Sequence, residues 1–233
     1  MQGRCSGRVV PSRCGRLPAR VISGSGSRPG EAMRAWIYDN TFRKVTDSWY
    51  RHVLDRLEPG SLLLDVGIGT AGALSRSAAR VQEKDIRVVG VDIDADYLRR
   101  ARRNVDRAGL SDRVRLHQIS IFDFQERGFD AAYFSASFML MPDPPGVLRH
   151  ITSLLAPGGR VFFTQTFEER RSPLVEKVKP LLHRVTTIHF GQVTYEADFL
   201  ATIAECGHEV VEHTVLSSNR VRSARLVVTR PQA

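Results

Sequence analysis

The sequence predicts an α/β fold built on a parallel sheet with helices on both faces. Over about residues 60–167, short apolar strands alternate with amphipathic helical stretches. The strands are near-continuous apolar runs, which is typical of a sheet that is buried on both faces. A glycine-rich loop also follows the first strand and opens a helix, as in nucleotide-binding sheets of this class.

The elements follow one another without a fixed repeat. The first expected helix, over 33–57, has apolar residues at three- and four-residue spacing and stops at Pro59-Gly60. Five strands are expected at 61–67, 87–92, 113–120, 129–135 and 160–167. The helices between them are expected at 70–81, 95–109 and 144–159. An inserted helix, another helix and two last strands are then expected at 172–185, 195–207, 209–216 and 223–229.

The composition is that of a globular protein. The 233 residues are 42% hydrophobic and 25% charged, which excludes a wholly disordered or collagen-like chain. No run approaches 18 uninterrupted apolar residues, so we expect no membrane-spanning helix. The three cysteines form no C-x-x-C pair, which argues against a disulfide framework or a zinc site, and we expect no metal.

Residues 1–30 are expected to be a disordered basic leader, followed by one domain over 31–233. The leader holds six of the 34 basic residues and none of the 25 acidic ones, so the domain itself carries only about +3 of the net charge of +9. That small charge makes a nucleic-acid partner unlikely. The leader composition suits a mitochondrial or plastid transit peptide. The alternatives are a disordered tail, or upstream sequence with translation starting at Met33 instead of Met1, in which case we expect a cytoplasmic protein.

The segment LDVGIGTAG, over residues 64–72, is the first candidate site. Gly67 and Gly69 permit a tight turn and the close approach of a ligand to bare backbone. The amides of the following helix N-terminus can face that ligand. Asp92 ends the next strand, where a carboxylate can accept hydrogen bonds from both ribose hydroxyls of an adenosine. These residues predict a nucleoside-containing cofactor at the carboxyl ends of the strands.

Asp65 discriminates between cofactors. Gly67, Gly69 and Gly72 match the G-x-G-x-x-G dinucleotide fingerprint, but a carboxylate two residues before the first glycine would oppose a pyrophosphate. It suits a cation, and S-adenosylmethionine carries an α-ammonium and a sulfonium. The alternative role for Asp65 is to cap the turn.

Five segments carry a family resemblance: LLLDVGIGTAGAL, VVGVDIDADYL, VRLHQISIFDF, FDAAYFSASFMLMPDP and LLAPGGRVFFTQTF. They resemble the successive motifs of class I S-adenosylmethionine-dependent methyltransferases. The resemblance implies a doubly wound, mostly parallel seven-stranded sheet, Rossmann-like, of order 3-2-1-4-5-7-6 with strand seven antiparallel. It also implies that Asp65, Gly67 and Gly69 hold the methionine end and that Asp92 holds the ribose. Thr70, in the same loop, and Ser135, beside the transferred methyl, complete the expected contacts.

Two positions depart from the family pattern. Ala71 stands where the family has its third loop glycine, and Ser120 stands where many members have an Asp that meets the adenine amino group. Asp123 lies close enough in sequence to substitute. Ile93 and Ile121 are expected to sandwich the adenine, although either residue could instead belong to the core.

The segment before the first strand also resembles part of a known family. Tyr38-Asp39 is similar to a Tyr-Asp pair in quinone-biosynthesis C-methyltransferases, where the segment covers the cofactor. We therefore expect residues 31–58 to form an N-terminal helical lid, with ordinary aromatic packing as the alternative.

The fourth-strand exit, residues 135–141, is expected to face the acceptor. It lacks the N-P-P-Y pattern of amino-methylating enzymes that act on nucleic acid bases or glutamine, and is similar to the exit loops of small-molecule methyltransferases. Gln165 is a further pocket candidate. Methyl transfer requires alignment of the acceptor more than a base, so no catalytic residue is assigned.

Three histidines are candidate bases: His150, His183 and His189. Five arginines of the helix expected at 95–109 are expected to form a solvated face: Arg99, Arg100, Arg102, Arg103 and Arg107.

The sequence thus predicts an enzyme that transfers a methyl group from S-adenosyl-L-methionine to a small, partly apolar molecule. The first alternative is an RNA or protein methyltransferase, motivated by the basic leader and the arginine-rich helix. Asp65 and the lack of a second substrate domain argue against a nicotinamide-dependent oxidoreductase, which the glycine spacing alone would allow. A non-catalytic binding module on the same fold is the last alternative, and the oligomeric state is left open.

Overall fold

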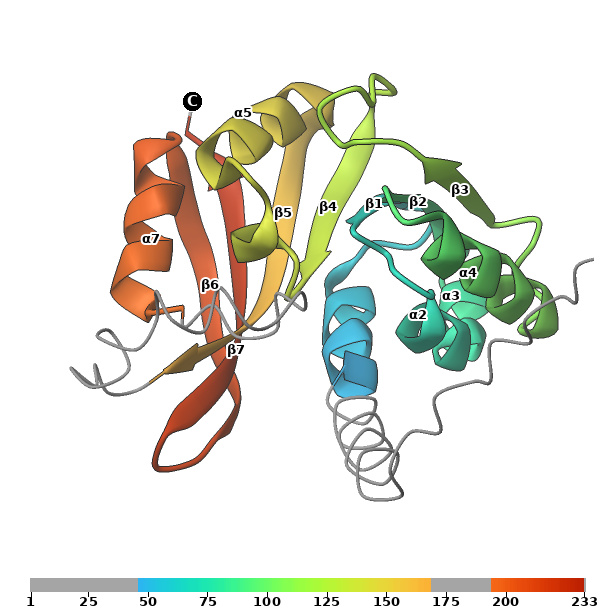
Figure 1. Ribbon diagram of the computed structural model, residues 1–233, viewed down its shortest axis with the longest axis horizontal. Coiled ribbons are helices and arrows are strands. Elements are labelled where there is room, and N and C mark those ends of the chain that lie inside the picture. Colours follow the sequence, from blue (N-terminus) through green and yellow to red (C-terminus); the bar gives the residue numbers. More distant parts are fainter. Residues whose placement is uncertain (1–45, 169–193, 233) are drawn as a thin grey trace, which may run out of the picture. The chain divides into compact units, whose positions relative to one another are not determined.

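Seven strands form a single sheet in the order β3-β2-β1-β4-β5-β7-β6 (Figure 1). The computed structural model describes residues 46–168 and 194–232. The predicted leader, the first part of the predicted lid and the inserted helix at 172–185 lie outside these ranges. The strands are β1 (Leu62–Val66), β2 (Arg87–Asp92), β3 (Val114–Gln118), β4 (Phe129–Ser135), β5 (Leu155–Glu168), β6 (His208–Ser218) and β7 (Arg222–Pro231).

The directions of the strands confirm the predicted topology. β1 lies between β2 and β4 and pairs with both in parallel, and β3 and β5 extend the parallel part on either side. β7 runs antiparallel to both β5 and β6. The carboxyl ends of β1, β2 and β4 therefore meet at one edge of the sheet, where ligands bind in folds of this kind.

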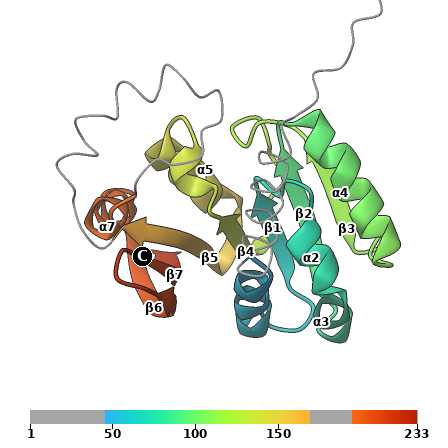
Figure 2. The ribbon, with the colours of Figure 1, turned by 60° about the horizontal axis from the view of Figure 1, so that its bottom comes forward.

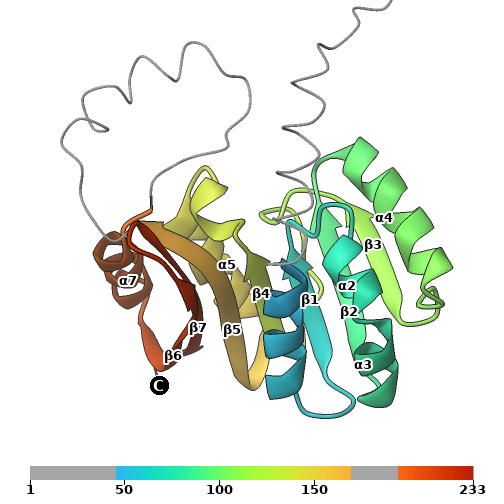
Figure 3. The same ribbon diagram turned by 90° about the horizontal axis from the view of Figure 1, so that it is seen from below.

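Helices cover both faces of the sheet (Figures 2 and 3). One apolar cluster joins the sheet to a first helix over residues 46–56 and to three helices that follow: α2 (Gly72–Arg76), α3 (Ala78–Glu83) and α4 (Ala95–Arg107). A second cluster on the other face includes residues of α5 (Pro144–Leu154) and α7 (Glu196–Glu205). The apolar runs along the strands supply both clusters, as predicted for a doubly covered sheet. Among the described residues, no helix is long and apolar enough to cross a bilayer.

Two predicted helices differ from the structure by more than one or two terminal residues. The helix expected at 144–159 ends at Leu154, and β5 begins at Leu155. Pro157 explains the difference, because it restricts the preceding residue to extended backbone and cannot continue a helix. The helix expected at 70–81 is divided into α2 and α3 at Ser77, whose torsion angles (φ −98°, ψ 15°) lie outside the helical range.

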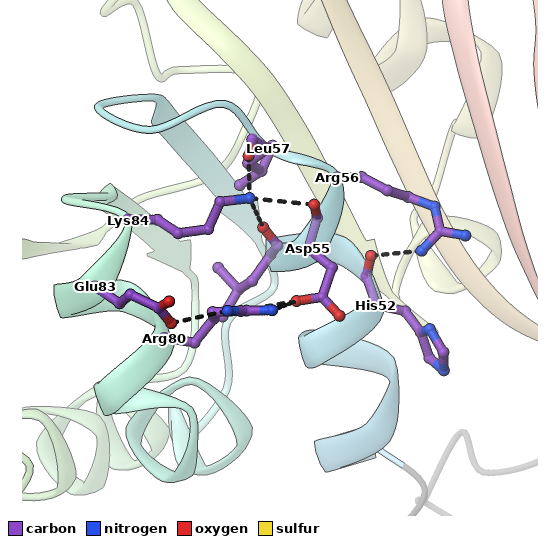
Figure 4. A network of polar contacts seen from close by, with 8 residues as sticks. His52, Asp55, Arg56, Leu57, Arg80, Glu83 and Lys84 are labelled. Carbon is purple, nitrogen blue, oxygen red and sulfur yellow. Dashed lines mark hydrogen bonds and ion pairs between the residues drawn. The ribbon is translucent and has the colours of Figure 1, made fainter.

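The first helix is fastened to α3 by a polar network (Figure 4). Lys84 Nζ donates to the carbonyl oxygens of Leu54 at 2.9 Å and Asp55 at 3.1 Å, and also to that of Leu57. Arg80 bonds the Asp55 carboxylate, with Nε 2.8 Å from Oδ1. Carbonyl groups at a helix C-terminus lack intrahelical partners and carry partial negative charge, so a lysine there stabilises the helix end. The network fixes the helix that places Tyr50 against β1.

Candidate functional site

The loop between β1 and α2 turns sharply at the carboxyl edge of the sheet. Gly67 and Gly69 have positive φ angles of 74° and 58°. The Gly67 and Ile68 amides donate to the Val91 carbonyl oxygen at 2.9 and 3.2 Å, which ties the loop to β2. A Cβ atom at Gly67 would lie 3.0 Å from the Cβ of Ser137, so glycine is required there for space as well as for its torsion angles.

Asp65 is the buried acid of the site. Its side chain is 2% exposed, and its Oδ2 accepts a hydrogen bond from the Tyr50 hydroxyl at 2.9 Å. Its Oδ1 is buried and has no hydrogen-bond partner within the described part of the chain. Burial raises the pKa of Asp65 to about 7, against the lowering effect of the Tyr50 hydrogen bond. A buried acceptor without a donor is costly, so this oxygen suits a ligand group that donates a hydrogen bond.

Asp92 links the loop to the end of β2. Its Oδ2 accepts from the Gly69 amide at 2.9 Å, and its Oδ1 accepts from the Asp94 amide at 2.9 Å. A carboxylate has about four acceptor positions, so each oxygen can still accept another hydrogen bond. The structure thus connects Asp92 with Gly69.

The exit of β4 folds back onto the exit of β1. Ala136 has a left-handed φ of 55°, and its amide donates to the Thr164 carbonyl at 2.8 Å. The Ser137 hydroxyl donates to the Val66 carbonyl at 2.7 Å. These bonds hold Ser135 beside the glycine loop. Phe138 is buried in the second apolar cluster, so it belongs to the core rather than to an acceptor pocket.

The residues predicted to contact the adenine differ in their exposure to solvent. Ile93 is 74% exposed just after β2, which leaves its side chain free to cover a base. Ile121 is buried in the second apolar cluster, the core alternative foreseen for it. The Ser120 hydroxyl accepts from the Phe122 amide at 3.3 Å, and the Asp123 amide donates to the Ser120 carbonyl at 3.0 Å. The loop after β3 is therefore held by its own turn.

A hollow of about 620 Å³ opens beside the loop. We call it the α2–α4 hollow. Its described lining residues come from the glycine loop, from α2 and α4, and from the ends of the first helix and β4: Thr46, Gly67, Ile68, Thr70, Gly72, Ala73, Arg76, Tyr97, Arg100, Arg103, Asn104, Arg107 and Ser135. Three predicted site residues, Gly67, Thr70 and Ser135, therefore share one cavity. Asp65, Gly69, Asp92 and the residues expected at the adenine do not line it.

The sequence interpretation missed two features of the site. Tyr50 lies in the first expected helix, which was predicted from its apolar spacing alone, yet the Tyr50 hydroxyl donates a hydrogen bond to Asp65. No local pattern signals this contact, because it joins side chains 15 residues apart in sequence. Arg100, Arg103 and Arg107 were expected to form a solvated face. They are exposed, but all three also border the hollow, and their three- and four-residue spacing was a signal that they share one helix face.

The remaining candidates lie elsewhere. His150 Nε2 lies 2.8 Å from the Phe124 carbonyl oxygen, and His183 and His189 fall outside the described residues. Gln165 is buried, and its amide nitrogen lies 3.4 Å from both the Thr166 carbonyl oxygen and the Thr194 hydroxyl. Within residues 46–168 and 194–232, no three His, Cys, Asp or Glu side chains are grouped so that they could hold a metal ion.

The fold and the loop define a class of enzyme. The sheet order, the antiparallel β7 and a glycine loop flanked by two acids are the features implied by the resemblance to class I S-adenosylmethionine-dependent methyltransferases. A family model described as a methyltransferase domain matches residues 57–212, well over half of the chain. The chain belongs to this family, and it is an S-adenosylmethionine-dependent methyltransferase.

Named relatives agree with that assignment. The chain is 29% identical over 186 residues to a phosphatidylethanolamine N-methyltransferase of Cereibacter sphaeroides, covering 78% of this chain and 87% of the relative. It is 33% identical over 115 residues to a ubiquinone biosynthesis O-methyltransferase of Xanthomonas axonopodis pv. citri, covering 48% of this chain and 46% of that one. The second match thus spans less than half of the relative.

Solved structures share the fold at low sequence identity. The [4+2]-cyclase SpnF superposes with a TM-score of 0.64 at 18% identity, covering 82% of each chain. A SAM-dependent methyltransferase from Geobacter sulfurreducens, solved with S-adenosyl-L-homocysteine, superposes with a TM-score of 0.61 at 15% identity, covering 80% of this chain and 90% of that one. Since SpnF is titled a cyclase, the shared fold alone does not specify the reaction.

Proposed function

We propose that the protein transfers a methyl group from S-adenosylmethionine to a small, partly apolar acceptor, and that Asp65 receives the α-ammonium of the cofactor. The observation that carries this proposal is the buried Asp65 Oδ1, which has no hydrogen-bond partner in the described part of the chain. An ammonium group supplies both the missing donor and the opposite charge. The residues present therefore fit the cofactor.

Other residues at the carboxyl edge of the sheet bind the remaining parts of the cofactor in this proposal. Asp92 keeps acceptor positions for the ribose hydroxyls while the hydrogen bond from the Gly69 amide holds the glycine loop in place. Gly67 and Gly69 leave bare backbone beside the methionine end. The exposed Ile93 covers the adenine. Ile121 would contribute to the adenine site only as the buried support beneath it.

Methyl transfer depends more on aligning the acceptor with the methyl group and excluding water than on acid–base groups. When bound, S-adenosylmethionine supplies a methyl carbon that is already activated by its positively charged sulfur. Alignment of two reactants alone can be worth an effective molarity of ~10⁵ M or more. The Ser137–Val66 bond and the folded-back exit of β4 give a fixed wall against which an acceptor can be aligned. No described residue needs to act as a base for an acceptor with a free lone pair.

A small acceptor has support from the relatives and from the sequence. The relatives named above are, by their names, a phosphatidylethanolamine N-methyltransferase and an O-methyltransferase of ubiquinone biosynthesis. The β4 exit also lacks the N-P-P-Y pattern of enzymes that methylate amino groups of nucleic acid bases or glutamine. Both observations favour a small molecule over RNA or protein.

Calorimetry of the unmutated protein with S-adenosylmethionine and with NADH tests the cofactor. We expect binding of the first and none of the second, and the reverse result would refute the proposal. Incubation with labelled cofactor and a metabolite extract, followed by mass identification of the product, then tests the acceptor class. If label appeared in RNA or protein but not in metabolites, the acceptor would be a macromolecule and the proposed small acceptor would be wrong.

A further inference from the structure

Four of the described residues that line the α2–α4 hollow are arginines. Arg100, Arg103 and Arg107, which we call the arginine stripe, lie on one face of α4, and Arg76 belongs to α2. No Asp or Glu is found among the described lining residues. The charge of the hollow is therefore positive, although the domain as a whole is nearly balanced.

Within the described part of the chain, the arginine stripe has no carboxylate partner, unlike many other arginines of the domain. Arg76 is held by Asp47, with Nε 2.6 Å from Oδ2. Arg56 pairs with Glu212, and Arg99, also on α4, pairs with Asp96. Among the described residues, by contrast, no ion pair or side-chain hydrogen bond involves the three arginines of the stripe. Like charges three and four residues apart destabilise a helix, so this arrangement has a cost that a bound anion would remove.

The stripe is also fixed relative to the glycine loop. Asn104, between Arg103 and Arg107 in the sequence, donates from Nδ2 to the Thr70 carbonyl at 2.9 Å. This bond joins α4 directly to the loop that carries Gly67 and Gly69. A molecule held by the stripe would therefore extend along the same cavity toward Gly67 and Ser135, which line it as well.

We propose that the arginine stripe binds a phosphate group of the methyl acceptor, so that the hollow holds a phosphorylated small molecule with its other end toward Gly67 and Ser135. This inference rests on the proposed function, since it specifies the acceptor of that same site. Guanidinium groups bind phosphate oxygens through paired hydrogen bonds, and a phosphate ester carries up to two negative charges.

The geometry favours a single phosphate over a nucleic acid. From Arg100 to Arg107 the helix rises only about 10 Å, at about 1.5 Å per residue. The cationic groups border one partly open hollow that Gly67 and Ser135 also line, rather than a long exposed track. RNA binding needs several phosphate contacts along a backbone and depends steeply on salt.

The test compares the unmutated full chain with the triple variant R100Q/R103Q/R107Q. Arg102→Gln is the matched control, because Arg102 is exposed on the same helix, does not line the hollow and has no carboxylate partner among the described residues. Calorimetry measures the binding of phenyl phosphate, and flotation measures the binding of phosphatidylcholine vesicles that contain phosphatidic acid. The affinity for S-adenosylmethionine is measured for each variant, so that misfolding is recognised.

We expect the unmutated protein to bind phenyl phosphate, the vesicles or both, and the triple variant to bind them at least tenfold more weakly. Arg102→Gln should change these affinities less than twofold, and all three proteins should bind S-adenosylmethionine alike. Binding of phenyl phosphate alone identifies a soluble phosphate ester, and binding of vesicles alone identifies a lipid headgroup.

Three results would overturn the inference. The unmutated protein could bind neither probe, or the control could lose as much affinity as the triple variant. The third result is salt-sensitive binding of a short RNA, lost in the triple variant, without binding of phenyl phosphate or vesicles. In each case, retained affinity for S-adenosylmethionine would leave the proposed function standing, whereas its absence from the unmutated protein would remove both.

Discussion

Replacing Asp65 with asparagine should stabilise the cofactor-free protein and impair it as an enzyme. The substitution keeps the side-chain shape and an oxygen that can accept the Tyr50 hydroxyl, but it removes the charge. In the folded protein the pKa of Asp65 is raised from 3.8 to about 7 by burial. Because the folded state holds the proton more tightly than the unfolded state, stability declines as the pH rises from about 4 to about 7.

The size of this effect follows from the pKa. A rise of about three units, at about 1.4 kcal/mol each, corresponds to a penalty of up to about 4 kcal/mol for the ionised form above about pH 7. Asparagine does not have this penalty, so Asp65→Asn should unfold at higher urea concentration at about pH 8, and the difference should vanish near about pH 4. The affinity for S-adenosylmethionine should fall by at least about 30-fold, since truncating one partner of a buried charge pair costs about 2–5 kcal/mol.

Urea unfolding at the two pH values and calorimetric titration with S-adenosylmethionine measure these opposed effects. Asp112→Asn is the control, because Asp112 is exposed and far from the loop in the sequence, and it should change neither quantity. If Asp65→Asn lowered stability at about pH 8 while leaving cofactor affinity intact, Asp65 would be a turn cap and our reasoning about a cationic ligand would be wrong.

Three further substitutions test the surroundings of the site. Tyr50→Phe removes the hydroxyl that donates to Asp65, so cofactor affinity should fall about tenfold. Because this hydrogen bond lowers the pKa of Asp65, its loss should shift the pH dependence of binding to higher pH, which calorimetric titrations at several pH values would show. If the pH dependence of cofactor affinity were unchanged, Tyr50 would only support the fold and would not affect the ionisation of Asp65. Gly67→Ala should lower the free energy of unfolding in urea by about 1–3 kcal/mol, more than Gly128→Ala. Both glycines have positive φ, but only at Gly67 would the new Cβ lie 3.0 Å from the Cβ of Ser137. Equal losses of stability would contradict this close contact. Asp92→Asn should weaken cofactor binding at least about tenfold, since the asparagine NH2 group accepts no hydrogen bond and either the Gly69 or the Asp94 amide loses its acceptor. Unaltered binding would exclude a ribose contact.

Much of the fold could be predicted because its signals are local. Apolar runs such as 61–67 and 87–92 define buried strands by composition alone, and the family resemblance supplied their order. The end of α5 was predicted too late because apolar periodicity outweighed the restriction that Pro157 places on the residue before it. Boundaries depend on such single residues, whereas the existence of an element depends on many.

Only the part of the site that belongs to the repeating strand–loop–helix pattern could be located from the sequence. The glycine loop and the acid at the end of β2 follow adjacent parallel strands, and a hydrogen bond from the Gly69 amide to Asp92 joins them. The Tyr50 hydroxyl and the Ser137 hydroxyl join the site through tertiary contacts across 15 and 71 residues, which no sequence pattern encodes. The roles of the predicted cofactor residues, and of residues 1–30 as a transit peptide, stay predictions.

The most direct test of the account counts protons released when S-adenosylmethionine binds. Calorimetric titrations in two buffers of different ionisation enthalpy give this number. With a pKa of about 7, Asp65 is about three-quarters protonated at about pH 6.5 and must ionise to face a cation, so binding should release about 0.7 proton, and none in Asp65→Asn. Tight binding by the unmutated protein without proton release would contradict the claim that Asp65 receives the charge of the cofactor.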